Sequence, residues 1–159
     1  MKSDDAQSKT VAGPQGMILS DLIGRVDIRV RYSETDRMGI AYNAHYLTWF
    51  EVGRTELMRE LGLSYREVEE RGVSLPLVES RTKLRIPVEY DDILTIETSI
   101  AKLRSRMIEF EYRILRGRKI VAEGSTEHAS VVSDGTRGKK SANLPEWLKK
   151  KFIALPPAK

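Results

Sequence analysis

The chain has 159 residues, of which 40% are hydrophobic and 31% are charged. This length and balance predict one globular domain with enough apolar side chains to form a core. Because the sequence contains no cysteine, disulfides, thiolate nucleophiles and cysteine-ligated zinc or iron–sulfur sites are excluded. No apolar run approaches the roughly 20 residues of a membrane span, and no N-terminal apolar stretch looks like a signal peptide. We therefore expect a soluble, cytoplasmic protein.

The net charge of +4 is not spread evenly along the chain. Residues 23–131 contain 18 basic and 18 acidic side chains, whereas residues 132–159 contain seven basic and two acidic ones. The excess therefore belongs to one segment and not to a general basic surface. We expect three parts, in chain order: a disordered or loosely attached N-terminal segment over 1–22, a folded domain over 23–132, and a basic C-terminal tail over 133–159 with a candidate short helix at 144–152.

A strand and a long helix are expected first. From Val26 to Tyr32, apolar and charged residues alternate with a period of two, which is typical of a half-buried strand. A helix is expected from Asn43, which can cap it, to Leu61, because apolar residues recur there at spacings of three and four. Gly53 lies inside this apolar stripe, so the helix should approach its neighbour closely at that point.

Gly62 should end the long helix, and the pattern then changes. A short second helix is expected from Ser64 to Arg71, because Ser64 and Glu67 have the spacing of a capping box. Four strands should follow, over 73–86 with a bend near Pro76, over 92–103, over 107–115 and over 120–132. Short turns join the last three, which favours an antiparallel meander. One helix packed on one sheet is an α+β design. The uncovered faces and edges indicate pairing with a second copy.

Several common kinds of site are absent from the sequence. The only histidines, His45 and His128, do not form a metal-spaced cluster, so we expect no metal site. There is no G-x-S-x-G elbow, no P-loop, and no G-x-G-x-x-G after a strand. Hydrolysis would therefore have to rely on a carboxylate, backbone amides and water.

The loop between the first strand and the long helix is the best candidate for such chemistry. Asp36 follows the strand and lies just before a helix N-terminus, whose free N–H groups carry partial positive charge. These donors can polarise a carbonyl oxygen while a carboxylate attacks the carbonyl carbon or activates water. Gly39 would let the backbone approach a ligand closely. The alternative is that Asp36 is a turn or capping residue and that Gly39 only turns the chain.

The stretch from Val30 to Glu51, VRYSETDRMGIAYNAHYLTWFE, resembles the hot-dog-fold acyl-CoA thioesterases of the 4-hydroxybenzoyl-CoA thioesterase class. The shared signature is a strand, then T-D-x-x-G, a tyrosine, and an aromatic-plus-Glu pair in the helix. Residues 89–94 and 122–128 resemble two further segments of the family. The resemblance implies a hot-dog fold, an antiparallel sheet of about five strands wrapped around a long central helix. It also implies hydrolysis of an acyl-CoA to a carboxylic acid and free coenzyme A.

The resemblance also implies roles for individual residues. Asp36 matches the catalytic carboxylate, acting as nucleophile or general base, and the backbone N–H of Asn43 matches the donor that polarises the thioester carbonyl. Gly39 and Tyr42 line the same loop. Tyr42 and Tyr46 could line an apolar pocket for the acyl group, although the same side chains could equally belong to the core. No metal and no cofactor is implied.

Coenzyme A carries phosphates, so basic residues are expected near the mouth of the site. Arg104, Ser105 and Arg106 lie at a strand turn in a basic stretch, and they are the candidate phosphate contact. The alternative is a solvated basic turn. The expected partners are an acyl-CoA or acyl-carrier-protein substrate and a second copy of the chain, in a homodimer or homotetramer. No nucleic-acid partner is expected, because neither a recognition helix nor an aromatic-interleaved basic surface is visible.

Two other functions are compatible with this kind of domain. A hydratase of the same fold would need a histidine five residues after the acid, where this chain has Ala41, so it is disfavoured. A non-catalytic acyl-CoA-binding or regulatory module would bind the thioester without turnover. His45 is expected to be a hydrogen-bonded structural residue. Glu51 could be a second acid of the site, but an ion pair with Arg54, three residues later, is the simpler expectation.

Overall fold

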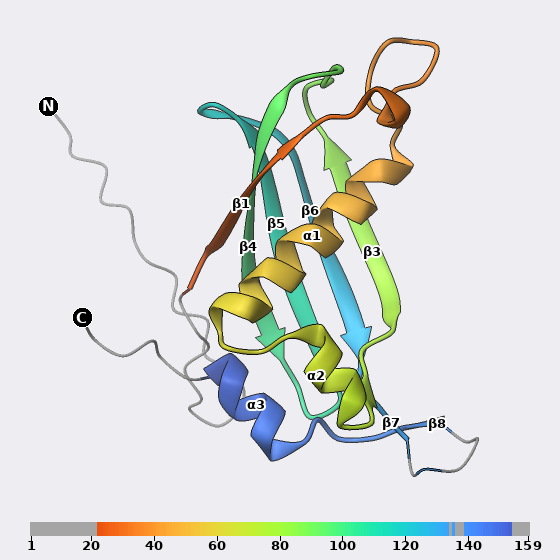
Figure 1. The fold of residues 1–159 in the computed structure, drawn as a ribbon, viewed down its shortest axis with the longest axis vertical. Coiled ribbons are helices and arrows are strands. Elements are labelled where there is room, and N and C mark those ends of the chain that lie inside the picture. Colours follow the sequence, from red (N-terminus) through yellow and green to blue (C-terminus); the bar gives the residue numbers. More distant parts are fainter. Residues whose placement is uncertain (1–21, 134, 136–138, 154–159) are drawn as a thin grey trace, which may run out of the picture.

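The computed structural model describes residues 22–133, 135 and 139–153. All but one residue of the segment expected to be loosely attached, 1–22, lie outside this range. The elements in chain order are β1 (Gly24–Arg29), the 3-10 turn η1 (Tyr32–Glu34), α1 (Ala44–Glu60), α2 (Tyr65–Glu70), β2 (Val73–Ser74), β3 (Leu77–Leu84), β4 (Ile93–Leu103), β5 (Met107–Arg116), β6 (Lys119–Ala129), β7 (Val131–Ser133), β8 (Lys139–Ser141) and α3 (Glu146–Ile153) (Figure 1).

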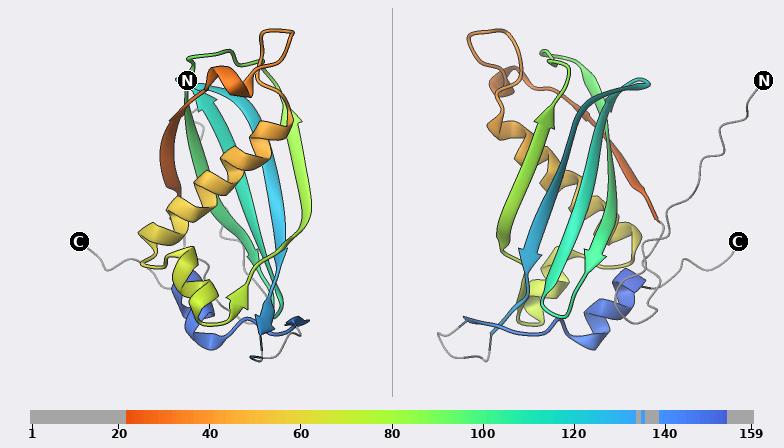
Figure 2. Two further views of the ribbon diagram at one scale, coloured as in Figure 1. Left: turned by 45° about the vertical axis from the view of Figure 1, so that its right-hand side comes forward. Right: turned by 180° about the vertical axis from the view of Figure 1, so that it is seen from behind.

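Five strands form the main sheet, in the order β1-β4-β5-β6-β3, and every neighbouring pair is antiparallel. The β4-β5-β6 meander is the one expected from the short turns. The sheet curves around α1, which lies diagonally across one face, while the view from behind shows no helix over the middle of the other face (Figure 2). The α+β prediction, one long helix on one antiparallel sheet, is therefore confirmed.

Two expected strands are each divided where the chain passes from one sheet to another. The strand expected over 73–86 breaks into β2 and β3 at Pro76, which has no N–H for a ladder and whose carbonyl accepts a hydrogen bond from the amide of Ala129 at 3.1 Å. The strand expected over 120–132 breaks into β6 and β7 at Ser130. β2, β7 and β8 form a separate three-stranded sheet. The single bend expected near Pro76 is thus a change of sheet.

α1 and the main sheet approach each other most closely at glycines, which have no side chain. A Cβ on Gly53 would lie 2.8 Å from Cγ2 of Ile96 on β4 and closer still to the hydroxyl of Thr98. On the facing sheet, a Cβ on Gly124 would lie 2.5 Å from Cζ of Phe50. The close approach expected at Gly53 is therefore confirmed. A second glycine, on β6, leaves room for the ring of Phe50 from the sheet side.

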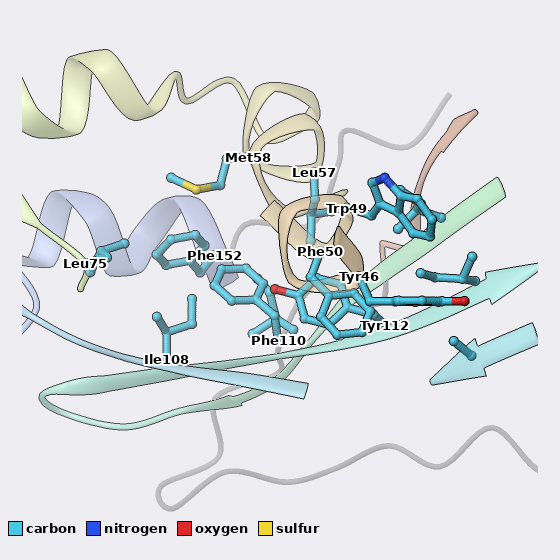
Figure 3. Packing of buried hydrophobic residues seen from close by; sticks show 14 of the residues in the cluster. Tyr46, Trp49, Phe50, Leu57, Met58, Leu75, Ile108, Phe110, Tyr112 and Phe152 are labelled. Carbon is cyan, nitrogen blue, oxygen red and sulfur yellow. The ribbon is translucent and has the colours of Figure 1, made fainter. Parts of the chain in front are cut away.

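Aromatic side chains fill the layer between α1 and the sheet (Figure 3). The ring of Phe50 stacks on that of Tyr112, with centroids 4.3 Å apart and planes 15° apart. Phe110 meets Phe152 of α3 edge to face, with centroids 6.5 Å apart. Burial of these rings is the main source of stability for the contact between helix and sheet.

The helix ends follow the local signals in the sequence. Gly62 ends α1 in the left-handed region at φ +72°. The capping box of α2 is formed in both directions between Ser64 and Glu67. None of the helices in the described ranges is long and apolar enough to cross a membrane.

α3 belongs to the same core as α1. Leu148 and Phe152 are fully buried, and Leu144, just before the helix, is 1% exposed. The amide of Leu144 also donates to the carbonyl of Ser105 in the β4–β5 turn at 2.7 Å. The folded unit therefore extends through residue 153, and does not end at 132 as the charge distribution indicated.

Replacing Gly53 with Ala should destabilise the protein. The new methyl group would lie too close to two side-chain atoms of β4, so the cost should fall in the upper part of the roughly 1–3 kcal/mol typical of overpacking. This exceeds the roughly 1 kcal/mol that Ala gains over Gly in a helix. The free energy of unfolding in urea measures the effect. Thr48→Ala, at an exposed position of α1, should be neutral. Equal stability of Gly53→Ala and wild type would contradict the close contact.

Candidate active site

The loop that follows β1 is folded back on itself around Asp36. The amide of Asp36 donates to the carbonyl of Ile40 at 3.0 Å, and that of Gly39 donates to the carbonyl of Asp36 at 2.9 Å. Oδ1 of Asp36 accepts a hydrogen bond from the amide of Met38 at 2.8 Å. Gly39 has φ +77°, which a residue with a side chain would adopt only with strain. The second carboxylate oxygen of Asp36 has no hydrogen-bond partner in the described ranges, so it is available to a ligand.

Glu34 anchors this loop to α1. Its carboxylate is 2% exposed and accepts hydrogen bonds from the amide of Arg31 at 2.8 Å, the guanidinium of Arg31 at 2.8 Å and Nε1 of Trp49 at 3.1 Å. Burial alone would raise the pKa of Glu34, but the hydrogen bonds from Arg31 and Trp49 hold that pKa below its ordinary value. The carbonyl of Glu34 also accepts from the amide of Tyr42 at 2.8 Å. Both ends of the loop are therefore fixed by one buried residue.

The first turn of α1 points two unpaired amides at this loop. Asn43 stands at the N-cap position, as expected, but its side chain makes no capping hydrogen bond. The first N–H groups with a backbone acceptor are those of His45 and Tyr46. The amides of Asn43 and Ala44 have no acceptor in the part of the chain that the structure describes. A helix N-terminus with free donors can stabilise a developing oxyanion.

Backbone pairing holds Asp36 and Asn43 in the same small region. Thr35 and Ala41 form an isolated antiparallel bridge, which brings together the two sides of the loop. The amide of Ala41 donates to the carbonyl of Val88 at 2.8 Å, which ties the loop to the segment after β3. The Asp36 carboxylate and the two free amides therefore belong to one short loop whose backbone is held at several points.

The sequence matches the thioesterase-like superfamily over residues 30–152. The chain belongs to this superfamily. It is 38% identical over 92 residues to a putative acyl-CoA thioesterase of Bacillus subtilis, YneP, and the match covers 58% of this chain and 67% of that protein. The resemblance noted from the T-D-x-x-G signature is thus confirmed.

Solved structures agree on the fold. A hypothetical protein from Thermus thermophilus superposes with a TM-score of 0.76 at 34% identity, covering 81% of this chain and 96% of that one. A mutant 4-hydroxybenzoyl-CoA thioesterase complexed with 4-hydroxybenzoyl-CoA superposes with a TM-score of 0.72 at 20% identity, covering 82% of this chain and 98% of that one. The hot-dog fold of this superfamily member is therefore the one expected.

The other expected substrate contacts in the loop region differ in exposure. The side chain of Tyr42 is 52% exposed and meets the ring of His45 edge to face at 6.4 Å. Tyr46 is 2% exposed and packs on Trp49 with ring centroids 4.8 Å apart, so it lies in the core. Burial also raises the pKa of the Tyr46 hydroxyl. Of the two tyrosines, only Tyr42 is open to a ligand in this arrangement.

The expected phosphate contact lies far from Asp36 of the same chain. Arg104, Ser105 and Arg106 form the β4–β5 turn, at the opposite end of the main sheet from the loop (Figure 1). Arg104 bonds Glu127 at 3.1 Å, and Arg106 bonds Oδ1 of Asn143 at 3.2 Å. One chain alone therefore does not bring this turn to its own candidate carboxylate.

Basic residues that the sequence did not single out lie at the loop itself. Arg31 bonds Glu34, and Arg116 bonds Asp92 at 2.6 Å. Arg37, next to Asp36, is exposed and has no ion-pair partner in the described ranges. Its position directly after the T-D signature is the signal that could have identified it as a cation near the site.

The side chains of His45 and Glu51 differ in their contacts. The ring of His45 makes no hydrogen bond to any described residue, so the expected hydrogen-bonded role is wrong and the aromatic contact with Tyr42 replaces it. Glu51 is paired with Arg54 as expected, at 3.8 Å, with the carboxylate side chain 65% exposed. Within the described residues, no group of three histidine or acidic side chains could hold a metal ion.

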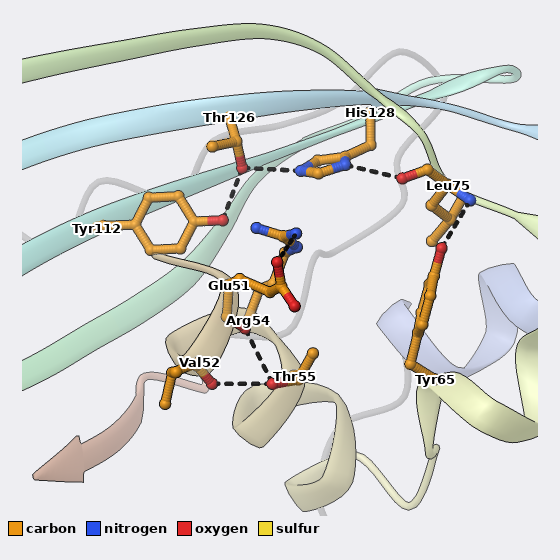
Figure 4. A network of polar contacts seen from close by, with 9 residues as sticks. All are labelled: Glu51, Val52, Arg54, Thr55, Tyr65, Leu75, Tyr112, Thr126 and His128. Atoms are coloured by element: carbon orange, nitrogen blue, oxygen red, sulfur yellow. Dashed lines mark hydrogen bonds and ion pairs between the residues drawn. The ribbon is translucent and has the colours of Figure 1, made fainter. Parts of the chain in front are cut away.

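His128 is buried in a chain of hydrogen bonds with a defined direction (Figure 4). Nδ1 lies 2.9 Å from the carbonyl oxygen of Leu75, which can only accept, so Nδ1 carries the proton. Nε2 then accepts from the hydroxyl of Thr126 at 2.9 Å. The Thr126 oxygen in turn accepts from the hydroxyl of Tyr112 at 2.6 Å. Burial lowers the pKa of His128 from 6.5 to about 4, so the ring is neutral at pH 7.

The neutral His128 should make stability depend on pH. The histidine takes up a proton near pH 6.5 in the unfolded chain but only near pH 4 when folded. Its contribution is therefore complete above pH 6.5 and is lost as pH falls towards 4, by up to about 3 kcal/mol. His128→Gln should flatten the pH dependence of the free energy of unfolding between pH 7.5 and 4.5. An unchanged slope in this variant would contradict the neutral buried histidine.

Proposed function

We propose that this chain hydrolyses acyl-CoA thioesters to a carboxylic acid and free coenzyme A. The observation that carries the proposal is that the Asp36 carboxylate, with one oxygen unpaired within the described ranges, and the free amides of Asn43 and Ala44 belong to the same short, hydrogen-bonded loop. Membership of the superfamily supports the substrate class, as do the names of the curated relatives, which include a putative acyl-CoA thioesterase of Bacillus subtilis and an acyl-CoA thioesterase of Haemophilus influenzae. An acyl-carrier protein as the thiol carrier stays a prediction.

The two amides would act on the thioester carbonyl. Its oxygen gains negative charge as the carbon becomes tetrahedral, and the start of a helix offers about half a unit of positive charge in addition to the N–H donors. Removing one donor from such a site typically costs about 3–4 kcal/mol of transition-state stabilisation. Because the Asn43 side chain takes no part in capping, the role assigned to this position belongs to its backbone.

Asp36 would supply the second part of the reaction. As a general base it takes a proton from water, the water oxygen bonds to the carbonyl carbon, the C–S bond breaks, and the thiolate of coenzyme A leaves. As a nucleophile its oxygen bonds to the carbonyl carbon, the C–S bond breaks, and the thiolate of coenzyme A leaves. Water then hydrolyses the resulting mixed anhydride to the carboxylic acid and the free Asp36 carboxylate. The hydrogen bond from Met38 fixes the turn through Oδ1, which leaves Oδ2 free for either role.

Asp36→Asn should remove most of the activity without unfolding the loop. The amide oxygen of Asn can still accept from Met38, but the side chain can neither take a proton nor attack a thioester, so kcat should fall at least ~100-fold, the range typical of a lost general base. Release of free thiol from a panel of acyl-CoA substrates measures this. Asp27→Asn, a β1 carboxylate that bonds Thr95, is the matched control.

Turnover of the Asp36→Asn protein at the wild-type rate would exclude Asp36 as the catalytic group. Tight acyl-CoA binding by the wild type with no turnover would instead support the alternative, a non-catalytic binding module.

We further propose that the chain forms a homodimer through β3. This strand is an outer strand of the main sheet, and all eight of its residues are exposed. Leu77, Val78 and Leu84 are 42%, 59% and 51% exposed. An open edge with apolar side chains is prone to pair with another strand, and an isologous contact between two copies closes it. A homotetramer and a cytoplasmic location stay predictions.

Val78→Lys should weaken this dimer, because like charges from the two copies would meet at the paired edge. Sedimentation equilibrium should give twice the mass of the chain for the wild type and an increased monomer fraction for the variant. Ile23→Lys changes an apolar residue next to β1, the opposite outer strand, and should leave the mass unchanged. A monomeric wild type would rule out the dimer.

A further inference from the structure

A cavity of about 220 Å³ lies between α1 and the ends of β5 and β6, away from the Asp36 loop. Met58, Leu75 and Phe110 supply apolar walls, and Glu51, Arg54 and His128 supply polar ones. We refer to it as the Arg54 pocket.

The sheet side of the Arg54 pocket is rigid and uncharged. The hydrogen bonds from Tyr112 to Thr126, from Thr126 to His128 and from His128 to Leu75 all run in one direction. Each donor proton in this series of hydrogen bonds therefore already has an acceptor. The Tyr112 oxygen keeps its lone pairs, so this wall can accept a hydrogen bond from Arg54 but offers a ligand no further donor.

Arg54 is the one cation that lines the pocket among the described residues. Its side chain is 19% exposed, and its guanidinium points toward the Tyr112–Thr126–His128 chain (Figure 4). The nearest carboxylate, Glu51, is 3.8 Å away, beyond hydrogen-bond distance, and is itself largely in solvent. Most of the five N–H donors of Arg54 therefore lack an acceptor within the described part of the chain. A partly buried guanidinium with unpaired N–H donors favours binding of a ligand that carries an acceptor oxygen.

We propose that the Arg54 pocket is a specificity subsite, which selects acyl groups with a short apolar body and a hydrogen-bond-accepting oxygen at the far end. This inference rests on the proposed thioesterase function and deepens it. The apolar walls match the body of such a group, and Arg54 matches its terminal carboxylate or hydroxyl. The modest volume favours a short chain or a single ring over a long acyl chain.

In the proposed dimer through β3, the pocket of one copy would lie where it can receive an acyl group held at the Asp36 loop of the other copy, so the inference also rests on that dimer. Arg54 lies eleven residues after Asn43, about 16 Å along the axis of α1 at 1.5 Å per residue, which is far for a short acyl group. The loop of one chain lies near the C-terminal end of β3, through Val88, whereas Leu75 of the pocket precedes the N-terminal end of β3. Antiparallel pairing of two β3 strands brings these opposite ends together.

The test compares thioesters that differ only in the distal oxygen. Adipoyl-CoA against hexanoyl-CoA tests a carboxylate, and 4-hydroxybenzoyl-CoA against benzoyl-CoA tests a hydroxyl. A charge-assisted hydrogen bond to Arg54 should raise kcat/KM for at least one oxygen-bearing member by about 10–100-fold over its partner. Arg54→Met removes the donors but keeps an unbranched side chain, so the ratio should fall towards one. Arg59→Met, an exposed α1 arginine paired with Glu56, should keep the wild-type ratio.

Two results would overturn the proposal: no preference in either pair for the wild type, or a wild-type preference that Arg54→Met retains. If Arg54→Met does not fold, Arg54→Lys takes its place. Because lysine keeps the charge but lacks the planar fork of five donors, the wild-type ratio should become smaller, and an unchanged ratio would overturn the proposal. If no thioester is hydrolysed, the proposed function fails, and titration of the same pairs into the full chain tests the pocket separately. Tighter binding of the oxygen-bearing members would then support it, and equal binding would overturn it.

Discussion

The close packing of α1 on the main sheet is the constraint on which the rest of the molecule depends. Gly53 on the helix and Gly124 on β6 remove side chains from both sides of the contact, so aromatic rings such as Phe50 and Tyr112 can stack directly between the layers. The position of α1 then fixes where its free amides point and which way Arg54 faces. A shift of the helix would therefore disturb the candidate active site and the Arg54 pocket together.

Glu34 extends this dependence to the loop that carries Asp36. A buried carboxylate is costly unless donors surround it, and here Arg31 and Trp49 supply them. Because Trp49 belongs to α1, the loop that carries Asp36 is tied to the helix that supplies the amides. The positions of the Asp36 carboxylate and of the free amides thus both depend on α1. The proposed reaction requires this, because both groups must reach the same carbonyl.

Features set by neighbouring residues could be predicted from the sequence, and features set by distant contacts could not. Alternation and helical spacing predicted the long elements, and local glycine and capping signals predicted how α1 and α2 end. The signature around Asp36 located the candidate site. The anchoring role of Glu34 depends on a partner fifteen residues away, and the Arg54 pocket depends on residues from separate strands. Neither arrangement produces a periodic pattern of residues in the sequence.

Two expected strands break, near Pro76 and Ser130, because the segments on either side join different sheets. α3 is buried because it joins the same core as α1. The charge excess of the C-terminal region concealed its apolar residues, Leu148 and Phe152, because three consecutive lysines stand between them in the sequence.

The burial of α3 has a consequence for how the protein is made. Phe152 packs against Phe110, so the core has an open side until α3 has left the ribosome. During synthesis, at about 5–20 residues per second, β4, β5 and β6 can pair while this apolar surface is still bare. The nascent chain is therefore most exposed to aggregation and to chaperones in the interval between the completion of β6 and the arrival of α3.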